Sequence, residues 1–199
     1  MLSKAREKGF YVFEKFLSPD LCDHLARDAS RALSKSPFYS GHFDGAIVNY
    51  KECTIDSKKI ANFRSIDYVS TMVKQLFFSN IHQENLESPH VIFLRNDGYI
   101  KPHVDNVSQQ ILFSYLWDKY CGGIIAGISL LSTRSMAFNH EEGMEQFEAQ
   151  LPPGSLYIQR YRTGFWSTYR YSLESRYCYT HAIQPGISER MSIIFRSKS

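Results

Sequence analysis

The second half of the chain is a series of short β-rich runs separated by turn signals, and this pattern limits the folds open to it. The runs lie at residues 91–94, 100–105, 123–131, 135–139, 146–151, 155–160, 177–183 and 190–196. Asn-Asp-Gly, Pro-Pro-Gly and Gln-Pro-Gly stand after three of them, and no long helical period interrupts the series. Closely spaced strands with such turns are typical of a β-sandwich or jelly roll. We therefore predict a mainly β (α+β) fold.

The N-terminal part predicts two helices beside this sheet. A short strand is expected over residues 10–16, followed by Ser18-Pro19-Asp20, which supplies an N-cap, a first-turn proline and an acid near the helix N-terminus. The apolar stripe of this helix consists of Leu21, Leu25, Ala29 and Leu33. A second helix over residues 65–78 would turn inward Ile66, Val69, Val73 and Leu76. Residues 38–57 predict loops or a hairpin.

Composition bounds the class of protein. The 199 residues suit one domain, and 43% hydrophobic with 22% charged residues is ordinary for a globular chain. No apolar run reaches the roughly 18 residues that span a bilayer, so no membrane span is expected. Four cysteines without a CxxC pair favour reduced thiols and an intracellular location. The net charge of +3 says little about partners, and a monomer is expected.

Three residues of the β-rich half predict a metal centre. His103 and Asp105 stand two apart, and side chains alternate along a strand, so both would share one face. His181, near the end of another apolar run, is the best candidate for a third ligand. Two histidines and a carboxylate form the facial triad of non-haem Fe(II) oxygenases, which leaves open coordination positions. The same three residues could instead hold the zinc of a hydrolase, and an isolated HxD is usually a satisfied polar contact.

The last run adds a second constraint. Arg190 and Arg196 are six residues apart and would point to the same face, with Ser192 and Ile194 between them. Burying two guanidinium groups is unfavourable unless each meets an anion. A dicarboxylic acid such as 2-oxoglutarate meets this need, because guanidinium and carboxylate pair through two parallel hydrogen bonds. A zinc hydrolase would not need such a pair.

The ordered set resembles the AlkB-like Fe(II)/2-oxoglutarate-dependent dioxygenases, whose signature is HxD…H…RxxxxxR on a double-stranded β-helix. Within that family it is nearer to the mitochondrial branch represented by the seventh human AlkB homologue. The segments that carry the resemblance are "GYIKPHVD" (98–105), "CGGIIAGISLLS" (121–132), "PPGSLYIQR" (152–160), "SRYCYTHAI" (175–183) and "RMSIIFR" (190–196). They cover roughly the C-terminal half, and the N-terminal half adds only "GFYVFEKFLSPD" (9–20).

The resemblance implies a role for each motif residue. Iron would be bound by His103, Asp105 and His181, and the 2-oxoglutarate carboxylates by Arg190 and Arg196. Tyr157 would reach the cosubstrate through its hydroxyl, although a tyrosine in an apolar strand is as readily a core aromatic. Leu94 or Asn96 occupies the position of a further cosubstrate contact on the strand before His103. The chain would be a single dioxygenase domain (1–199), with 1–88 supporting a metal- and 2-oxoglutarate-binding core at 89–199.

The implied reaction is oxidative and uses Fe(II), 2-oxoglutarate and O2. The cosubstrate is decarboxylated to succinate while a substrate C–H bond is hydroxylated, and a hydroxylated N-methyl group leaves as formaldehyde. We expect the substrate to be mitochondrial RNA, in the mitochondrial matrix. The alternatives are a protein side-chain hydroxylase or a partner-binding regulator acting in mitochondrial fatty-acid metabolism and programmed necrosis.

Two insertions depart from the family pattern, at 106–120 and 161–172. Each mixes aromatic with polar or basic residues, and each follows a strand that carries site residues. The segment Tyr161–Tyr171 contains Arg162 and Arg170 among aromatic side chains and could contact structured or single-stranded RNA. The first insertion favours a small amphipathic helix that covers the core. No lid motif of the base-repairing relatives is evident at 38–57.

Overall fold

The computed structural model describes residues 10–42, 45–77, 87–103, 124–140, 143, 145–160 and 179–196. The elements in chain order are β1 (Phe10–Phe13), α2 (Pro19–Ala32), η1 (Leu33–Lys35), β2 (Tyr39–Gly41), β3 (Ile47–Thr54), η2 (Ile60–Asn62), α3 (Arg64–Phe77), β4 (His90–His103), β5 (Ile124–Leu130), β6 (Arg134–His140), β7 (Gln146–Leu151), β8 (Leu156–Arg160), β9 (Tyr179–Ile183) and β10 (Arg190–Arg196).

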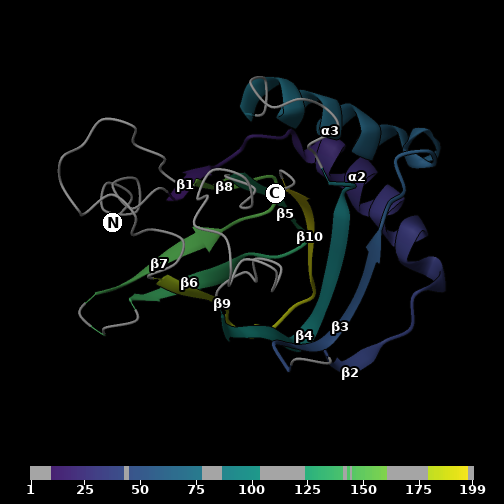
Figure 1. Ribbon diagram of the computed structural model, residues 1–199. Coiled ribbons are helices and arrows are strands. Elements are labelled where there is room, and N and C mark those ends of the chain that lie inside the picture. The colour runs from purple at the N-terminus through teal and green to yellow at the C-terminus, as the bar shows by residue number, and fades with distance from the viewer. Residues whose placement is uncertain are drawn as a thin grey trace, which may run out of the picture.

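The ten described strands form one antiparallel sheet that bends back on itself. Its order is β1-β8-β5-β10-β4-β9-β6-β7, with β3 beside β4 and β2 beside β3. Strand β4 joins the two layers: its first half pairs with β10, and its end pairs with β9. Figure 1 shows the two layers, with β7, β6 and β9 facing the layer that contains β8, β5 and β10. The jelly-roll prediction is confirmed.

Each face of the main layer has its own apolar cluster. Strand β10 shows the division, because Met191, Ile193 and Phe195 pack in the cluster beneath the helices, whereas Ile194 packs inside the bent sheet. Helices α2 and α3 lie together on the outer face of this layer (Figure 1). The inner cluster comprises Phe10, Tyr50, Ile92, Leu94, Ile125, Met136, Phe138, Ala149, Leu151, Tyr157, Ile183 and Ile194. The alternation predicted for 190–196 is therefore confirmed.

The helices follow the sequence signals closely. Ser18 caps α2, where its Oγ accepts a hydrogen bond from the Leu21 amide at 3.3 Å. Leu25, Ala29 and Leu33 are buried as expected. The described residues contain no helix long and apolar enough to cross a bilayer.

Leu76 on α3 was wrongly predicted to face the core. Ile66, Val69 and Val73 of the same helix are fully buried, but Leu76 is 56% exposed. It lies on the same face of the helix, so periodicity places it correctly in direction. The core cluster contacts α3 only as far as Val73. How far the core extends along the helix depends on the surface against which the helix packs. The helical period carries no information about that surface.

The turn signal at 95–98 falls inside β4, but at a point where its pairing with β3 is irregular. Leu94 lies opposite Tyr50 and Tyr99 opposite Val48, so four residues of β4 face Asn49 alone. Arg134 of β6, which is 3% exposed, packs against this stretch. Its guanidinium donates to the backbone carbonyls of Arg95, Asn96, Gly98, Gln184 and Ser188. Gly98 permits the close packing, since a Cβ there would lie 2.6 Å from the Asn49 carbonyl oxygen. One side chain thus satisfies three carbonyls of a stretch whose strand pairing is irregular.

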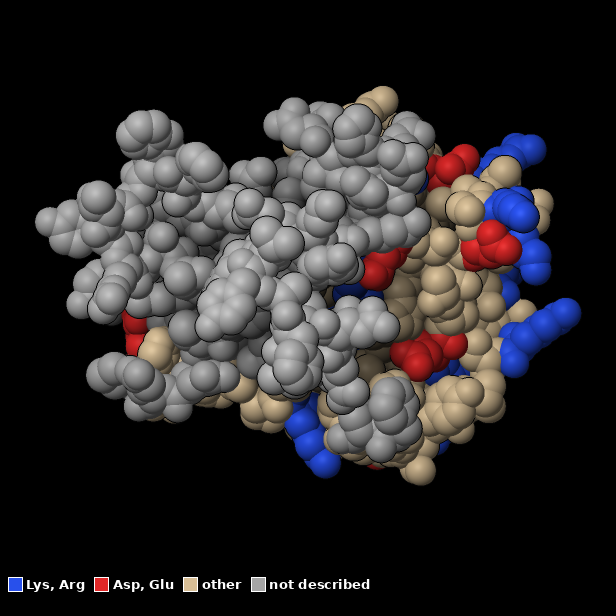
Figure 2. Space-filling model, viewed as in Figure 1, with Lys and Arg blue, Asp and Glu red and all other residues tan. Residues whose placement is uncertain are grey.

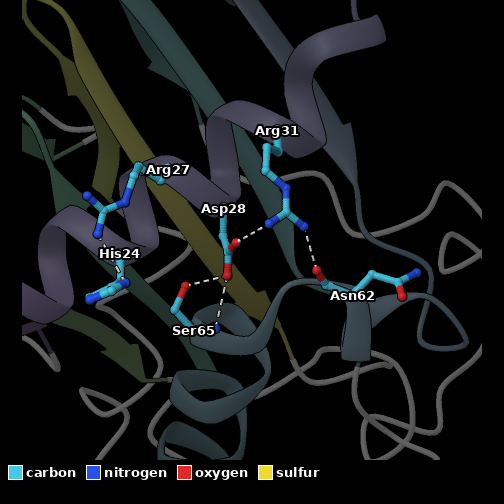
Figure 3. A network of polar contacts seen from close by, with 6 residues as sticks. All are labelled: His24, Arg27, Asp28, Arg31, Asn62 and Ser65. Atoms are coloured by element: carbon cyan, nitrogen blue, oxygen red, sulfur yellow. Dashed lines mark hydrogen bonds and ion pairs between the residues drawn. The ribbon is translucent and has the colours of Figure 1, made fainter.

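A polar network joins α2 to the start of α3 (Figure 3). Ser65 donates to Asp28 Oδ2 through its backbone N–H at 3.0 Å and its hydroxyl at 2.6 Å. Arg31 lies 3.2 Å from the other carboxylate oxygen and donates to the Asn62 carbonyl at 2.6 Å. Asp28 therefore satisfies a backbone amide in the first turn of α3, which has no partner within its own helix.

Replacing Asp28 with alanine is expected to lower the free energy of unfolding by about 2 kcal/mol, because it leaves a first-turn amide of α3 unpaired. Urea denaturation would measure the loss. Asp23→Ala, an exposed change on the same helix, should have little effect. Equal losses in both variants would show that the cap contributes nothing specific.

Candidate functional site

Two histidines come together at the end of β4. His103 lies opposite His181 of β9 in the strand register, and their ring centroids are 4.4 Å apart with an interplanar angle of 50°. Two imidazoles bound to one metal in adjacent positions, at about 2.1 Å from metal to nitrogen, have centroids roughly 4–5 Å apart. The pair therefore fits two ligands of one ion.

The orientation of His103 suits metal binding. Its Nδ1 lies 2.8 Å from the Lys101 carbonyl oxygen. A proton on Nδ1, donated to that carbonyl, leaves Nε2 as the nitrogen that can bind a metal. The partner ring of His181 lies beside Phe138, with centroids 6.3 Å apart, and Phe147 stacks on Phe138 at 4.6 Å. The histidine pair thus has an apolar wall on one side.

Asp105, the predicted carboxylate ligand, lies outside the described residues, as do the insertions 106–120 and 161–172. Within the described ranges, no three His, Cys, Asp or Glu residues come together as a metal site. The structure therefore brings together two of the three predicted ligands and leaves the third a prediction.

Arg190 is the most deeply buried charged group among the described residues. It is 1% exposed and points into the bent sheet. Its Nη1 donates to Ser192 Oγ at 3.2 Å, while Nε and Nη2 have no hydrogen-bond partner. Burial lowers the pKa of Arg190, and the charge and hydrogen bonding of Tyr157 oppose that lowering. Two unpaired donors on a buried cation are strongly unfavourable, and a carboxylate is the group that satisfies both. These donors fit a carboxylate of 2-oxoglutarate.

Tyr157 reaches Arg190 because Gly127, a residue without a predicted role, leaves room for its ring. Tyr157 on β8 is 4% exposed and lies opposite Gly127 of β5. A Cβ on Gly127 would overlap the Tyr157 ring. Glycine at this position therefore lets the ring cross β5 toward β10. A lone glycine in the apolar run "IIAGISLL" is the available signal, because glycine within a strand often marks close approach of another group.

Arg196 has different surroundings. It lies at the other end of β10, shares the inner face with Arg190, and is partly exposed. Its positive charge helps to lower the pKa of Glu52 on β3. In the described part of the chain, no carboxylate lies within ion-pair distance of Arg196. Arg190 and Arg196 therefore lie on the same face of β10, but Arg190 is buried and Arg196 is partly exposed.

The choice between Leu94 and Asn96 also has a structural answer. Leu94 is fully buried in the inner cluster, opposite Arg190 in the register. Asn96 is exposed, and its carbonyl accepts from Arg134 and from the Gly186 amide. Leu94 is thus the residue that faces the interior, and it offers only apolar surface.

Two curated proteins resemble the chain in sequence, and no family model matches it. The chain is 34% identical over 166 residues to "Alpha-ketoglutarate-dependent dioxygenase alkB homolog 7, mitochondrial" of Mus musculus, a match covering 80% of the chain and 65% of that protein. It is 37% identical over 146 residues to the Bos taurus protein of the same name, covering 73% and 59%. The chain therefore spans less than two thirds of the length of either relative.

Solved structures share its fold. A prolyl hydroxylase from Trichoplax adhaerens, in complex with a hypoxia inducible factor peptide fragment, superposes with a TM-score of 0.68 at 12% identity, covering 99% of this chain and 86% of that one. A Pseudomonas putida prolyl-4-hydroxylase gives 0.58 at 15% identity, covering 99% and 96%. At these identities the likeness establishes the jelly-roll fold alone.

Gly127→Ala is expected to lower the free energy of unfolding by about 2 kcal/mol, because the new methyl group displaces the Tyr157 ring from a packed interior. Chemical denaturation would measure it, with Gly41→Ala as control, since a Cβ at Gly41 has its nearest neighbour at 4.0 Å. The loss should shrink in a Tyr157→Leu background. An unchanged loss there would mean that the ring is not the obstacle.

Proposed function

We propose that the chain is an AlkB-like 2-oxoglutarate-dependent dioxygenase that hydroxylates a substrate C–H bond, with loss of the methyl group when that carbon is an N-methyl. One observation carries the proposal. The His103–His181 pair and the guanidinium of Arg190, with two unsatisfied donors, line the inside of the same bent sheet.

His103, Asp105 and His181 are the proposed iron ligands, because two imidazoles and one carboxylate suit Fe(II) and leave positions open. With 2-oxoglutarate and O2, bound iron supplies the oxidising chemistry, in which the cosubstrate becomes succinate and CO2. The remaining residues bind, orient and exclude water.

Arg190 is proposed to receive one carboxylate of 2-oxoglutarate through Nε and Nη2, with Tyr157 beside it. Arg196, at the other end of the same inner face, is proposed to receive the other carboxylate. Leu94 and Ile194 lie in the apolar cluster on this face. Apolar surroundings strengthen a guanidinium–carboxylate interaction because they exclude the water that would compete for it.

Methylated mitochondrial RNA is the proposed substrate. The support is the basic, aromatic segment Tyr161–Tyr171 and the mitochondrial location in the names of the two relatives. The described surface does not add to it: in the view of Figure 2, lysine and arginine side chains along the right-hand edge alternate with acidic ones. RNA binding therefore depends on the segment itself. We propose a mitochondrial location for the chain on the same grounds.

Anaerobic addition of 2-oxoglutarate to Fe(II)-loaded protein should produce the weak visible band of an iron–keto-acid chelate. Asp105→Ala is expected to abolish it. Arg190→Met should require at least about thirtyfold more 2-oxoglutarate, because a buried charge pair loses one partner.

Arg27→Met, an exposed change on α2, is the matched control and should titrate as wild type does. Absence of the band in folded, iron-bound wild type would exclude the dioxygenase mechanism. It would favour the zinc hydrolase or the partner-binding regulator.

Incubation with N-methylated mitochondrial RNA, Fe(II), 2-oxoglutarate and O2 should release formaldehyde in an amount equal to the methyl groups lost. Replacing both Arg162 and Arg170 with alanine is expected to raise KM for the RNA about tenfold at low salt through lost phosphate contacts. Lys58→Ala/Lys59→Ala removes the same charge elsewhere and should leave KM unchanged. No formaldehyde, together with a 16 Da gain on a mitochondrial protein, would favour the side-chain hydroxylase instead.

A further inference from the structure

Three chain segments that pass between the two layers of the sheet meet at the start of β6. They are residues 95–98 within β4, residues 131–133 between β5 and β6, and residues 184–189 between β9 and β10. Strands β6 and β9 lie in one layer, and β5 and β10 lie in the other (Figure 1). The spacing between the histidine pair on β4 and β9 and the arginine on β10 therefore depends on how these segments are held together.

Arg134, the first residue of β6, ties two of the three segments to each other. It is 3% exposed, and both terminal nitrogens of its guanidinium donate to carbonyls of β4 and of the connection between β9 and β10. The distances lie between 2.6 and 3.3 Å, and the acceptors are Arg95, Asn96, Gly98, Gln184 and Ser188. Each terminal nitrogen thus bridges the two segments.

The packing around this guanidinium is close on its remaining sides. A Cβ at Gly186 would lie 2.6 Å from Arg134 Nε and 2.7 Å from its Cζ. The Gly186 amide donates to the Asn96 carbonyl at 2.9 Å, so the connection between β9 and β10 packs directly on β4. Ser132, in the third segment, donates through its hydroxyl to the Glu189 carbonyl at 2.6 Å. All three segments are therefore joined at one point.

Backbone pairing holds each half of the site without this side chain. His103 lies opposite His181 of β9, and Leu94 lies opposite Arg190 of β10. The contacts of Arg134 fall between these two pairs along both segments that connect them. The side chain therefore acts on the spacing between the histidine pair and the buried arginine, and each pair remains held by its own ladder.

We propose that Arg134 is a positioning residue that sets the spacing between the histidine pair and Arg190, so that one 2-oxoglutarate contacts both. This inference rests on the proposed function, and it assigns to Arg190 the carboxylate farther from the keto group. A ligand that spans two groups gains affinity from both contacts only when their spacing matches its length. Loss of the Arg134 contacts would therefore weaken a ligand that spans the two groups and spare a ligand of the metal alone.

The test compares two ligands by anaerobic titration of Fe(II)-loaded protein, following the visible band of the chelate. The first is 2-oxoglutarate, and the second is pyruvate, which has a keto-acid end but no second carboxylate. Arg134→Met is expected to raise Kd for 2-oxoglutarate about tenfold and to leave Kd for pyruvate unchanged. Calorimetry with Mn²⁺ should show wild-type metal affinity in the same variant.

Gly186→Ala separates the position of Arg134 from its charge, because the new methyl group displaces the guanidinium and removes no cation. It should raise Kd for 2-oxoglutarate about fivefold and leave Kd for pyruvate unchanged. Asp28→Ala is the control for lost stability, since this carboxylate also satisfies a backbone amide but lies between the two helices. It should bind both ligands as wild type does.

A selective loss of 2-oxoglutarate affinity in both variants is the supporting result. Equal losses for the two ligands overturn the inference, because they place the defect at the metal. Wild-type affinity in Gly186→Ala beside a weakened Arg134→Met also overturns it, because the arginine would then act through its charge. If thermal unfolding shows that Arg134→Met does not fold, Gly186→Ala decides by the same comparison. Wild type that forms no chelate band overturns the proposed function, and the inference with it.

Discussion

The burial of the Arg190 guanidinium is the constraint around which the interior of the sheet is organised. A cation that is 1% exposed needs compensation, and the protein supplies only part of it, through Ser192 and the field of Tyr157. Gly127 is part of this arrangement, because a side chain at that position would prevent the Tyr157 ring from crossing β5 toward Arg190. The interior thus keeps an unsatisfied cation that an anionic ligand would complete.

Arg134 shows the other way to bury a guanidinium. It is nearly as buried as Arg190, but it donates to five backbone carbonyls from β4 and the 184–188 turn. Burial is the main cause of its lowered pKa, and the charge of Arg190 contributes. Both terminal nitrogens of Arg134 hold strands together and only its Nε has no partner, whereas Arg190 leaves both Nε and Nη2 without one. This difference supports the proposal that Arg190 is a binding group.

Sequence periodicity predicted the parts of the site that lie along one strand. The even spacing of Arg190 and Arg196 gave their common face, and the run 177–183 placed His181 where β9 brings it opposite His103. Sequence periodicity could not predict the features that depend on neighbouring strands. The continuity of β4, the role of Gly127 and the Glu52–His90 contact all arise from residues distant in sequence. The turn signal at Asp97-Gly98 coincides with the irregular pairing of β4 and β3, and it gave no indication that the strand resumes beyond it.

Strand β4 connects these observations. Its first half carries His90 and Leu94 beside β10, and its last residue is His103 beside β9. The same strand therefore contributes to the predicted cosubstrate region in one layer and to the histidine pair in the other. Arg134 fixes the bend between the two halves through three carbonyls of β4. Arg190 lies opposite Leu94 of β4, and His103 is the last residue of the same strand. The spacing between the proposed carboxylate-binding arginine and the proposed metal-binding histidine is therefore set along β4.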